Sequence, residues 1–303
     1  MISSKMIVKR NHFIFKQPGD NSFGAQIHKI ISLLFHLSAH APGSNYVFNL
    51  KNLRFVHPLF ILALAAYKEI LQRDGTDIEI VSPIESGCND YIDKIHFPCG
   101  IRPDHLSSWA TVLQSYEMKN YLPIINFPAA TTGPYVDLTN NLLSLLNRLI
   151  QSNLSLDNDF QNAVQYLISE ITDNVIQHSG NDRGWFMFQY YPTTLYLDIC
   201  IIDTGKTILG SYHDSGLYSI DSDVIAVEKA LTGISTKSKE RGTGLRTSRA
   251  ISMDGLAGDF LLWSGSAMYY NNTITQLPVK WHGTIVAMRI KRDIERFSIY
   301  NFV

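Results

Sequence analysis

Several features that would assign a chain to a function class are scarce in this sequence. Three cysteines, Cys88, Cys99 and Cys200, are scattered among 303 residues. An odd number without metal-ligand spacing predicts neither a disulfide framework nor a zinc site. The most apolar stretch, residues 58–67, is too short to cross a bilayer and leads into the charged Lys68. No secretory signal is evident, so we expect a cytoplasmic protein with no membrane partner.

The chain also lacks a dominant charge. Its 26 lysine and arginine residues nearly balance 27 aspartate and glutamate residues, which gives a formal net charge of −1. Proteins that bind nucleic acid usually carry a basic surface that neutralises phosphates. Aromatic and basic residues are not interleaved here as they are in single-strand binders. Nucleic acid is therefore not an expected partner.

What the sequence does contain is enough apolar residues, 45% of the chain, to fill packed cores. A length of 303 residues suggests about two domains. Residues 129–134, AATTGP, have the composition of a linker. We therefore expect one domain over residues 1–130 and a second over residues 131–303, both of the α/β (α+β) class.

The N-terminal region predicts a strand–helix–strand unit within a mixed α/β module. Apolar residues at helical spacing predict helices over residues 21–37, 58–73 and 86–95. Short alternating runs predict strands over residues 46–50 and 77–81.

The same region resembles a known fold. The segment 48–64, FNLKNLRFVHPLFILAL, is similar to the signature of STAS domains, the fold of anti-sigma-factor antagonists, in which a strand and short loop lead into a helix. Phosphorylated members carry a serine near that helix start, where this chain has His57, Pro58 and Leu59. The resemblance, over residues 46–97, therefore implies a STAS-like module that is not switched by phosphorylation there. We expect a structural or surface role for His57.

Further along, polar residues recur every four positions in a predicted helix, LISEITDNVIQHSG. Glu170, Asn174 and His178 should therefore share one side of that helix. Asn174 offers a neutral oxygen of the kind that Mg²⁺ accepts, and Glu170 can take a proton from an attacking water or hydroxyl. His178 can orient a phosphate or Asn174, or simply favour the helix dipole. The plain alternative is an amphipathic helix with a solvated polar side.

A second motif follows a predicted strand at residues 195–202. Asp203 stands at the strand end and Gly205 two positions later. A buried carboxylate there can accept a hydrogen bond from the exocyclic amine of adenine, and glycine lets the backbone turn beside a flat ligand. The alternative is an ordinary Asp-x-Gly turn.

A third motif precedes another predicted helix and consists of Gly242, Thr243, Gly244 and Leu245. Glycines allow close backbone approach, and the first amides of a helix point toward an anion. Lys237, Lys239 and Arg241 lie just upstream and either neutralise phosphate charge or belong to a solvated loop.

Together these motifs resemble the nucleotide-binding boxes of the GHKL ATPases, a superfamily of gyrase-type topoisomerases, Hsp-type chaperones, sensor histidine kinases and MutL mismatch-repair proteins. The matching boxes are Glu170-x-x-x-Asn174 (N), Asp203-x-Gly205 (G1) and Gly242-x-Gly244 (G2). Residues 281–288, WHGTIVAM, are similar to the closing strand of that fold, which often carries Gly-Thr. The resemblance covers residues 137–292.

The resemblance implies a Bergerat-type α/β sandwich, with a mixed sheet covered by helices on one face, that binds ATP and Mg²⁺. Asn174 would coordinate Mg²⁺, Glu170 would be the catalytic base, Asp203 would bind the adenine amine and Gly205 would shape its pocket. The other nucleotide-binding positions would be Lys237, Lys239, Arg241, Gly242, Thr243, Gly244, Leu245 and Thr284.

One departure from the family pattern concerns the last glycine of the G1 box, which is Thr207 here. A side chain there alters the adenine pocket or the hinge of the ATP lid, which the resemblance places at residues 209–235. Gly210, Gly216 and Gly233 are candidate hinges. No phosphoacceptor-histidine helix precedes the ATPase segment, so a sensor histidine kinase is not expected.

The expected function is that of an intracellular signalling or regulatory protein that binds ATP and Mg²⁺ and whose lid gates an unidentified protein partner. Hydrolysis and phosphotransfer use the same pocket, so the sequence leaves open whether the chain is an ATPase. One alternative is a serine/threonine kinase of the anti-sigma-factor type, whose substrates are STAS proteins. Another is a non-catalytic nucleotide-binding scaffold, which Thr207 keeps open. The oligomeric state is also open, a homodimer included.

Overall fold

The computed structural model describes residues 10–17, 20, 22–40, 44–129, 131–154, 158–180, 183–216, 219–234, 243–292 and 297–303. The chain divides into two compact units, Met1–Pro98 and Cys99–Val303. The expected border after residue 130 falls inside the second unit and needs correction. The reason is that strand β4 (Tyr121–Pro128) pairs with β5 (Arg183–Tyr191) in the sheet of that unit.

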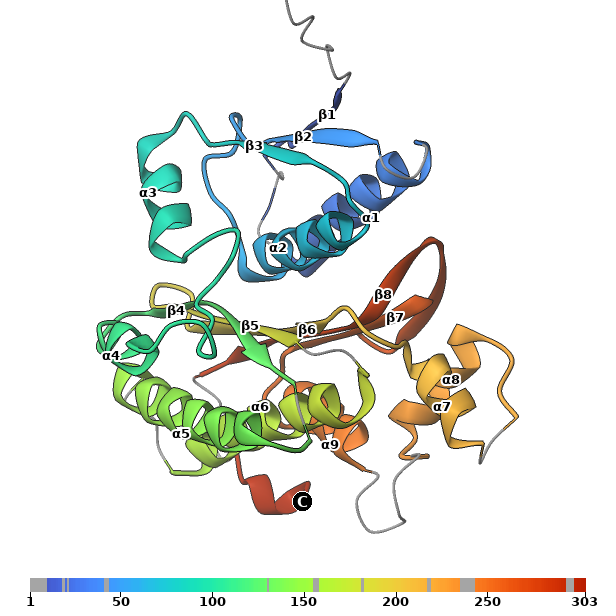
Figure 1. The fold of residues 1–303 in the computed structure, drawn as a ribbon. Helices are drawn as coiled ribbons and strands as arrows, with labels where there is room; N and C mark the ends of the chain where they lie inside the picture. Colours follow the sequence, from blue (N-terminus) through green and yellow to red (C-terminus); the bar gives the residue numbers. More distant parts are fainter. Residues whose placement is uncertain are drawn as a thin grey trace, which may run out of the picture. The chain divides into compact units, whose positions relative to one another are not determined.

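The first unit is a parallel three-stranded sheet with helices between its strands (Figure 1). Its elements are β1 (Arg10–Ile14), α1 (Phe23–Ser38), β2 (Asn45–Asn49), α2 (Pro58–Arg73), β3 (Ile78–Val81) and α3 (Ser86–Lys94). The strands lie in chain order, so each helix is a crossover between neighbours, and crossovers of one hand place α1 and α2 on the same face. The predicted strand–helix–strand unit is confirmed.

Local chemistry explains where these helices begin. The Ser22 hydroxyl accepts a hydrogen bond from the backbone N–H of Ala25, at 3.1 Å, and so caps α1. Proline stands at the first position of α2, where its missing N–H costs nothing. His57, just before it, is 3% exposed and therefore belongs to the core.

The second unit contains a five-stranded sheet with the order β4-β5-β6-β8-β7. The three further strands are β6 (Tyr196–Asp203), β7 (Asp259–Tyr270) and β8 (Thr273–Lys291). Every neighbouring pair is antiparallel, so the expectation of a mixed sheet was wrong. Tight turns join β5 to β6 and β7 to β8, and such turns reverse the chain direction. β4 lies at one edge of the sheet.

Helices lie along one face of this sheet, as expected (Figure 1). The helices of the unit are α4 (Trp109–Gln114), α5 (Pro134–Leu154), α6 (Asn158–His178), α7 (Ile208–Ser215), α8 (Asp223–Leu231) and α9 (Gly244–Ala250). Leucines on α5 and α6 pack with the strands in one continuous core. No helix in the described ranges has the length and apolar character needed to span a membrane.

The alternation of side chains along β6 and β8 positions the site. In β6, Leu197, Ile199 and Ile201 belong to the core under the helices, and the next residue of the same parity is Asp203. In β8, Val286 belongs to that core and the preceding residue of the same parity is Thr284. Each strand therefore ends its apolar stripe with a polar side chain on the helix side.

The sequence pattern of residues 260–263 and 267–270 suggests two strands joined as a hairpin, and this prediction is wrong. Both segments lie in the single strand β7, and Gly265, with a φ of +60°, interrupts the pairing register with β8 instead of turning the chain. The chain turns at Asn271 and Asn272, which both have positive φ, as a two-residue hairpin turn requires.

Candidate functional site

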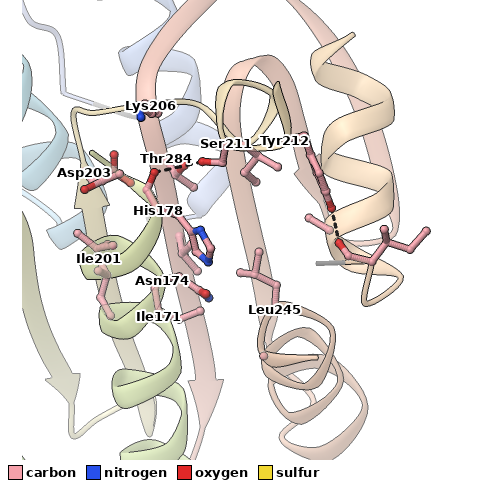
Figure 2. A pocket seen from close by; sticks show the side chains of 17 residues that line it. Ile171, Asn174, His178, Ile201, Asp203, Lys206, Ser211, Tyr212, Leu245 and Thr284 are labelled. Carbon is pink, nitrogen blue, oxygen red and sulfur yellow. Dashed lines mark hydrogen bonds between the residues drawn. The ribbon is translucent and has the colours of Figure 1, made fainter. Parts of the chain in front are cut away.

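A cavity opens among the end of β6, the middle of β8, helix α6, helix α7 and the start of α9 (Figure 2). We call it the inner cavity. The residues from the predicted nucleotide site that line it are Asn174, Asp203, Gly244, Leu245 and Thr284. Three motifs that are distant in the sequence therefore meet at one place.

Asp203 is the most buried charged group of the inner cavity, with only 3% of its surface exposed. Its carboxylate accepts hydrogen bonds from the N–H of Gly205, at 2.9 Å, and from the N–H and hydroxyl of Thr284. Burial raises the pKa of Asp203 to about 7, although these hydrogen bonds favour the charged form. The carboxyl group is therefore poised to gain or lose a proton near neutral pH.

The backbone behind Asp203 is closely packed. The indole N–H of Trp281 donates to the Asp203 carbonyl oxygen at 3.0 Å. Gly283 has a φ of +96°, and a Cβ there would lie 2.4 Å from the same oxygen. Only glycine fits, because a side chain would collide with backbone and the conformation disfavours L residues. The closing strand thus fixes the position of the carboxylate.

Helix α6 presents its polar residues to two different spaces. Asn174 and His178 line the inner cavity, and Figure 2 shows them on the side of the helix that faces Leu245. Glu170, one turn earlier, does not line it. Glu170 instead lies on a second depression between α6 and α9, which we call the outer groove. The groove residues used below are Tyr166, Glu170, Asp173, Gln177, Arg246 and Phe302.

Gly244 is the point where the two spaces meet, because it lines both. A Cβ on Gly244 would lie 2.0 Å from the Glu170 carboxylate oxygen Oε2. The carboxylate therefore abuts the backbone at the start of α9, and any side chain at position 244 would displace it. Thr243, the residue before, lines the outer groove.

The segment after Asp203 shows the role of Thr207, which stands where the G1 box usually has its last glycine. Its hydroxyl accepts a hydrogen bond from the N–H of Gly210, at 3.1 Å, and caps helix α7. Gly205 does not line the inner cavity, and its N–H serves the Asp203 carboxylate. The threonine therefore has a local structural role that glycine lacks.

The described residues of the expected lid region include a small core of their own. Tyr212, Ile220 and Ala226 are buried together within it. Ser211 in α7 donates a hydrogen bond to the carbonyl oxygen of His178, at 3.1 Å, and so ties α7 to α6. Tyr212 donates to the carbonyl oxygen of Ile234.

The candidate hinges differ in conformation. Gly216 and Gly233 have positive φ, of +62° and +86°, at the ends of α7 and α8. Gly210 lies inside α7. Bending at the first two requires no helix to break, whereas bending at Gly210 does.

Four predicted phosphate-binding residues, Lys237, Lys239, Arg241 and Gly242, lie outside the described residues.

Sequence reasoning missed several residues of the site. Ser264 in β7 accepts a hydrogen bond from the N–H of Ile208 and donates to the carbonyl oxygen of Gly283, both at 2.9 Å. It thereby joins the start of α7 to the strand behind Asp203. Tyr166 and Arg246 on the outer groove were also missed. Tyr166 precedes Glu170 by one helical turn, and that spacing was a usable signal.

In the described part of the chain, no group of three or more His, Cys, Asp or Glu residues is placed to hold a metal ion. No protein-family model, curated protein or solved structure matches the chain.

Proposed function

We propose that the second unit is a GHKL-type, Bergerat-fold module that binds ATP with Mg²⁺, and that the first unit is a STAS-like module in the same regulatory protein. The observation that carries the proposal is the buried Asp203 carboxylate, which lines one cavity with Asn174, Thr284 and the glycine start of α9. A buried carboxylate in a largely apolar cavity suits a ligand that donates a hydrogen bond from a flat ring.

The residues present fit a nucleotide. Asp203 and Thr284 recognise the adenine edge, while Ile171, Ile201 and Val286 provide apolar walls for the ring. Gly244, at the start of α9, lines both the inner cavity and the outer groove, and we place the phosphates beside its backbone. In this arrangement the adenine ring lies beside Asp203 and Thr284, and the phosphates extend toward the outer groove.

The amide oxygen of Asn174 is the protein ligand that we assign to Mg²⁺. A single protein oxygen suffices, since Mg²⁺ usually keeps several waters and takes other ligands from substrate phosphates. When bound, the ion neutralises phosphate charge. Glu170 then lies one turn of α6 away, on the phosphate side, as a base for the attacking group.

A gating role follows from the way in which α7 is held. Two hydrogen bonds tie it to neighbouring elements, one from the Ser211 hydroxyl to the carbonyl oxygen of His178 and one from the N–H of Ile208 to the Ser264 hydroxyl. A nucleotide between α6 and α7 bears on the same elements, so binding and the position of the lid are coupled. The surface of the lid is where we place the protein partner.

Calorimetric titration tests this proposal. ATP should bind wild-type protein in the presence of Mg²⁺, and GTP, which lacks the matching amine, should bind much more weakly. Asp203→Asn replaces one acceptor oxygen by a donor, so ATP affinity should fall about 10- to 100-fold. Asp254→Asn, an exposed carboxylate outside both lined spaces, is the matched control. Equal affinity for ATP in wild type and Asp203→Asn would refute the proposed site.

A further inference from the structure

Two histidines lie together at the end of α1 in the first unit, and the proposed nucleotide site uses neither. His36 is in the last turn of the helix, and His40 follows the residue that caps it. Side chains four residues apart share one side of a helix, and the two imidazole centroids are 4.7 Å apart. Phe13 in β1 packs beside His36 at 4.9 Å, and Tyr46 in β2 packs beside His40 at 5.8 Å, ring centroid to ring centroid. The pair is therefore held between two aromatic rings.

His36 has a ring nitrogen that lacks the hydrogen bond expected of a buried polar atom. Its Nε2 is shielded from solvent and has no hydrogen-bond partner among the described residues. Such atoms are rare, because an unpaired buried polar group destabilises the folded state. Burial, followed by the nearby His40, lowers the pKa of His36 from its ordinary value and so favours the neutral ring. A neutral imidazole has one nitrogen with a lone pair, which is the form that binds a metal ion.

The tautomer of His40 follows from a hydrogen bond. Its Nδ1 lies 2.8 Å from the carbonyl oxygen of His36, and a carbonyl oxygen can only accept, so Nδ1 carries the proton. The lone pair of the neutral ring is then on Nε2. Metal-binding histidines commonly donate their other N–H to a backbone carbonyl in this way, which fixes the orientation of the ring. His40 is partly exposed, so an ion can reach the pair from solvent.

The separation of the two rings fits one shared ion. A histidine nitrogen lies about 2.0–2.1 Å from zinc, which places the ion about 3.2 Å from the centre of the ring. Two rings that meet at one ion with an angle of about 90–110° then have centroids about 4.5–5.2 Å apart. The observed 4.7 Å lies within this range, and the rings are tilted by 52° rather than stacked flat. The end of α1 therefore holds the two rings at the spacing of a metal chelate.

We propose that His36 and His40 bind one divalent ion of the zinc, nickel and copper group through their Nε2 atoms. Imidazole suits these ions, whereas Mg²⁺ and Ca²⁺ prefer oxygen ligands. The described residues contain no group of three or more His, Cys, Asp or Glu side chains placed to hold a metal, so water fills the remaining positions and the ion exchanges readily. Bound there, the ion satisfies the buried nitrogen of His36 and links the end of α1 to the residue beyond its cap. The site does not depend on the proposed ATP site.

Calorimetric titration of the full chain with Zn²⁺, in a large excess of Mg²⁺ and without nucleotide, tests this site. Two variants should each weaken Zn²⁺ binding at least about tenfold, since even the loss of an outer-shell partner costs that much. His40→Asn keeps an N–H that can donate to the His36 carbonyl but removes the ligand nitrogen. His36→Phe keeps a ring beside Phe13 and removes the unpaired nitrogen, so without metal it should resist denaturant at least as well as wild type. His28→Gln, an exposed histidine earlier on α1, is the matched control and should bind Zn²⁺ as wild type does.

The outcomes decide for or against a shared ion. Weakened binding in His36→Phe and His40→Asn, with His28→Gln unchanged, supports it. No Zn²⁺ binding by wild type overturns it, and so does weakening in only one of the two variants when both are folded. Binding that both variants retain shows an adventitious ion on other histidines and overturns it as well. Should His36→Phe unfold, the His40→Asn titration decides. Because no nucleotide is present, failure of the ATP site leaves this result intact, and failure of the histidine site leaves the ATP site standing.

Discussion

The inner cavity and the outer groove share Gly244 but are built in opposite ways. In the inner cavity the decisive group, Asp203, is buried and held by strand backbone. In the outer groove, Asp173, Gln177 and Arg246 are exposed side chains on helices. A buried polar group that loses its hydrogen-bond partner destabilises the folded protein. The inner cavity therefore permits few residue types, whereas the outer groove tolerates substitutions. The comparison teaches that the buried space can specify one ligand closely, whereas the exposed groove can change its side chains without loss of the fold.

The largest expected effect is on the rate of phosphate release or transfer. It tests whether the inner cavity and the outer groove act separately. Glu170→Gln removes the proposed base but keeps the shape, so turnover should fall about 10²- to 10⁴-fold. ATP affinity, which we assign to the inner cavity, should stay within a few-fold of wild type. Single-turnover kinetics and calorimetry on the same samples measure both. Loss of affinity equal to the loss of rate would show that the two spaces do not act separately.

The next effect is on folding. Gly283→Ala forces a Cβ to within 2.4 Å of the Asp203 carbonyl oxygen, so the free energy of unfolding should fall by about 3 kcal/mol. Gly216→Ala, at a φ of +62° with no atom within 4 Å of the new Cβ, should cost about 1 kcal/mol. Denaturant unfolding of both variants isolates the collision from the shared backbone strain. Equal losses would mean that the packing behind Asp203 is looser than described.

The raised pKa of Asp203 makes a pH-dependent prediction. Burial sets it at about 7 in the folded protein, above the ordinary value near 3.8. The folded state therefore binds a proton that the unfolded state does not bind between these values, so stability rises as the pH falls through 7. From pH 8 to pH 5 this group should add about 2–3 kcal/mol to the free energy of unfolding. The difference between wild type and Asp203→Asn, measured by denaturant unfolding at each pH, should follow that curve, and a flat difference would contradict it.

The smallest effect concerns the cap of α7. Thr207→Ala should destabilise the start of the helix by about 1 kcal/mol, and Thr207→Gly by a few tenths. Hydrogen exchange of the Gly210 amide, which donates to the threonine hydroxyl, should accelerate about fivefold in Thr207→Ala. The glycine variant introduces the residue that is usual at this position of the GHKL pattern that the sequence resembles. If it also tightened ATP binding, Thr207 would affect the cavity as well as the helix.

Local pattern was enough to locate most helices and strands and to bring three motifs into one hypothesis. Four-residue spacing placed Glu170 and Asn174 on one helix, and strand alternation ended at Asp203. Spacing alone did not show that these two helix residues open onto different spaces. That division depends on where α9 packs, and Gly244 meets Glu170 across more than seventy residues of chain.

The misses have a shared physical reason. Ser264 bonds Ile208 across 56 positions, and a lone serine in a strand gives no sign of such a partner. The sheet order β6-β8-β7 and the strand β4 before the expected border are likewise pairings between distant segments. The predicted hairpin in β7 failed because Gly265 reads locally as a turn, whereas pairing with β8 keeps the strand continuous.

The hydrogen bond from Trp281 to the Asp203 carbonyl has a practical consequence. Tryptophan emission responds to the polarity and hydrogen bonding of its indole, and this indole is 1% exposed and attached to the backbone of the proposed adenine contact. Trp263 lies 6.3 Å away, ring centroid to ring centroid, so excitation passes between the two rings. Because the chain has only four tryptophans, its own fluorescence should respond to changes at the proposed adenine-binding end of the inner cavity. Every nucleotide, variant and pH described above can therefore be compared on unlabelled protein, with Trp281→Phe as the blank.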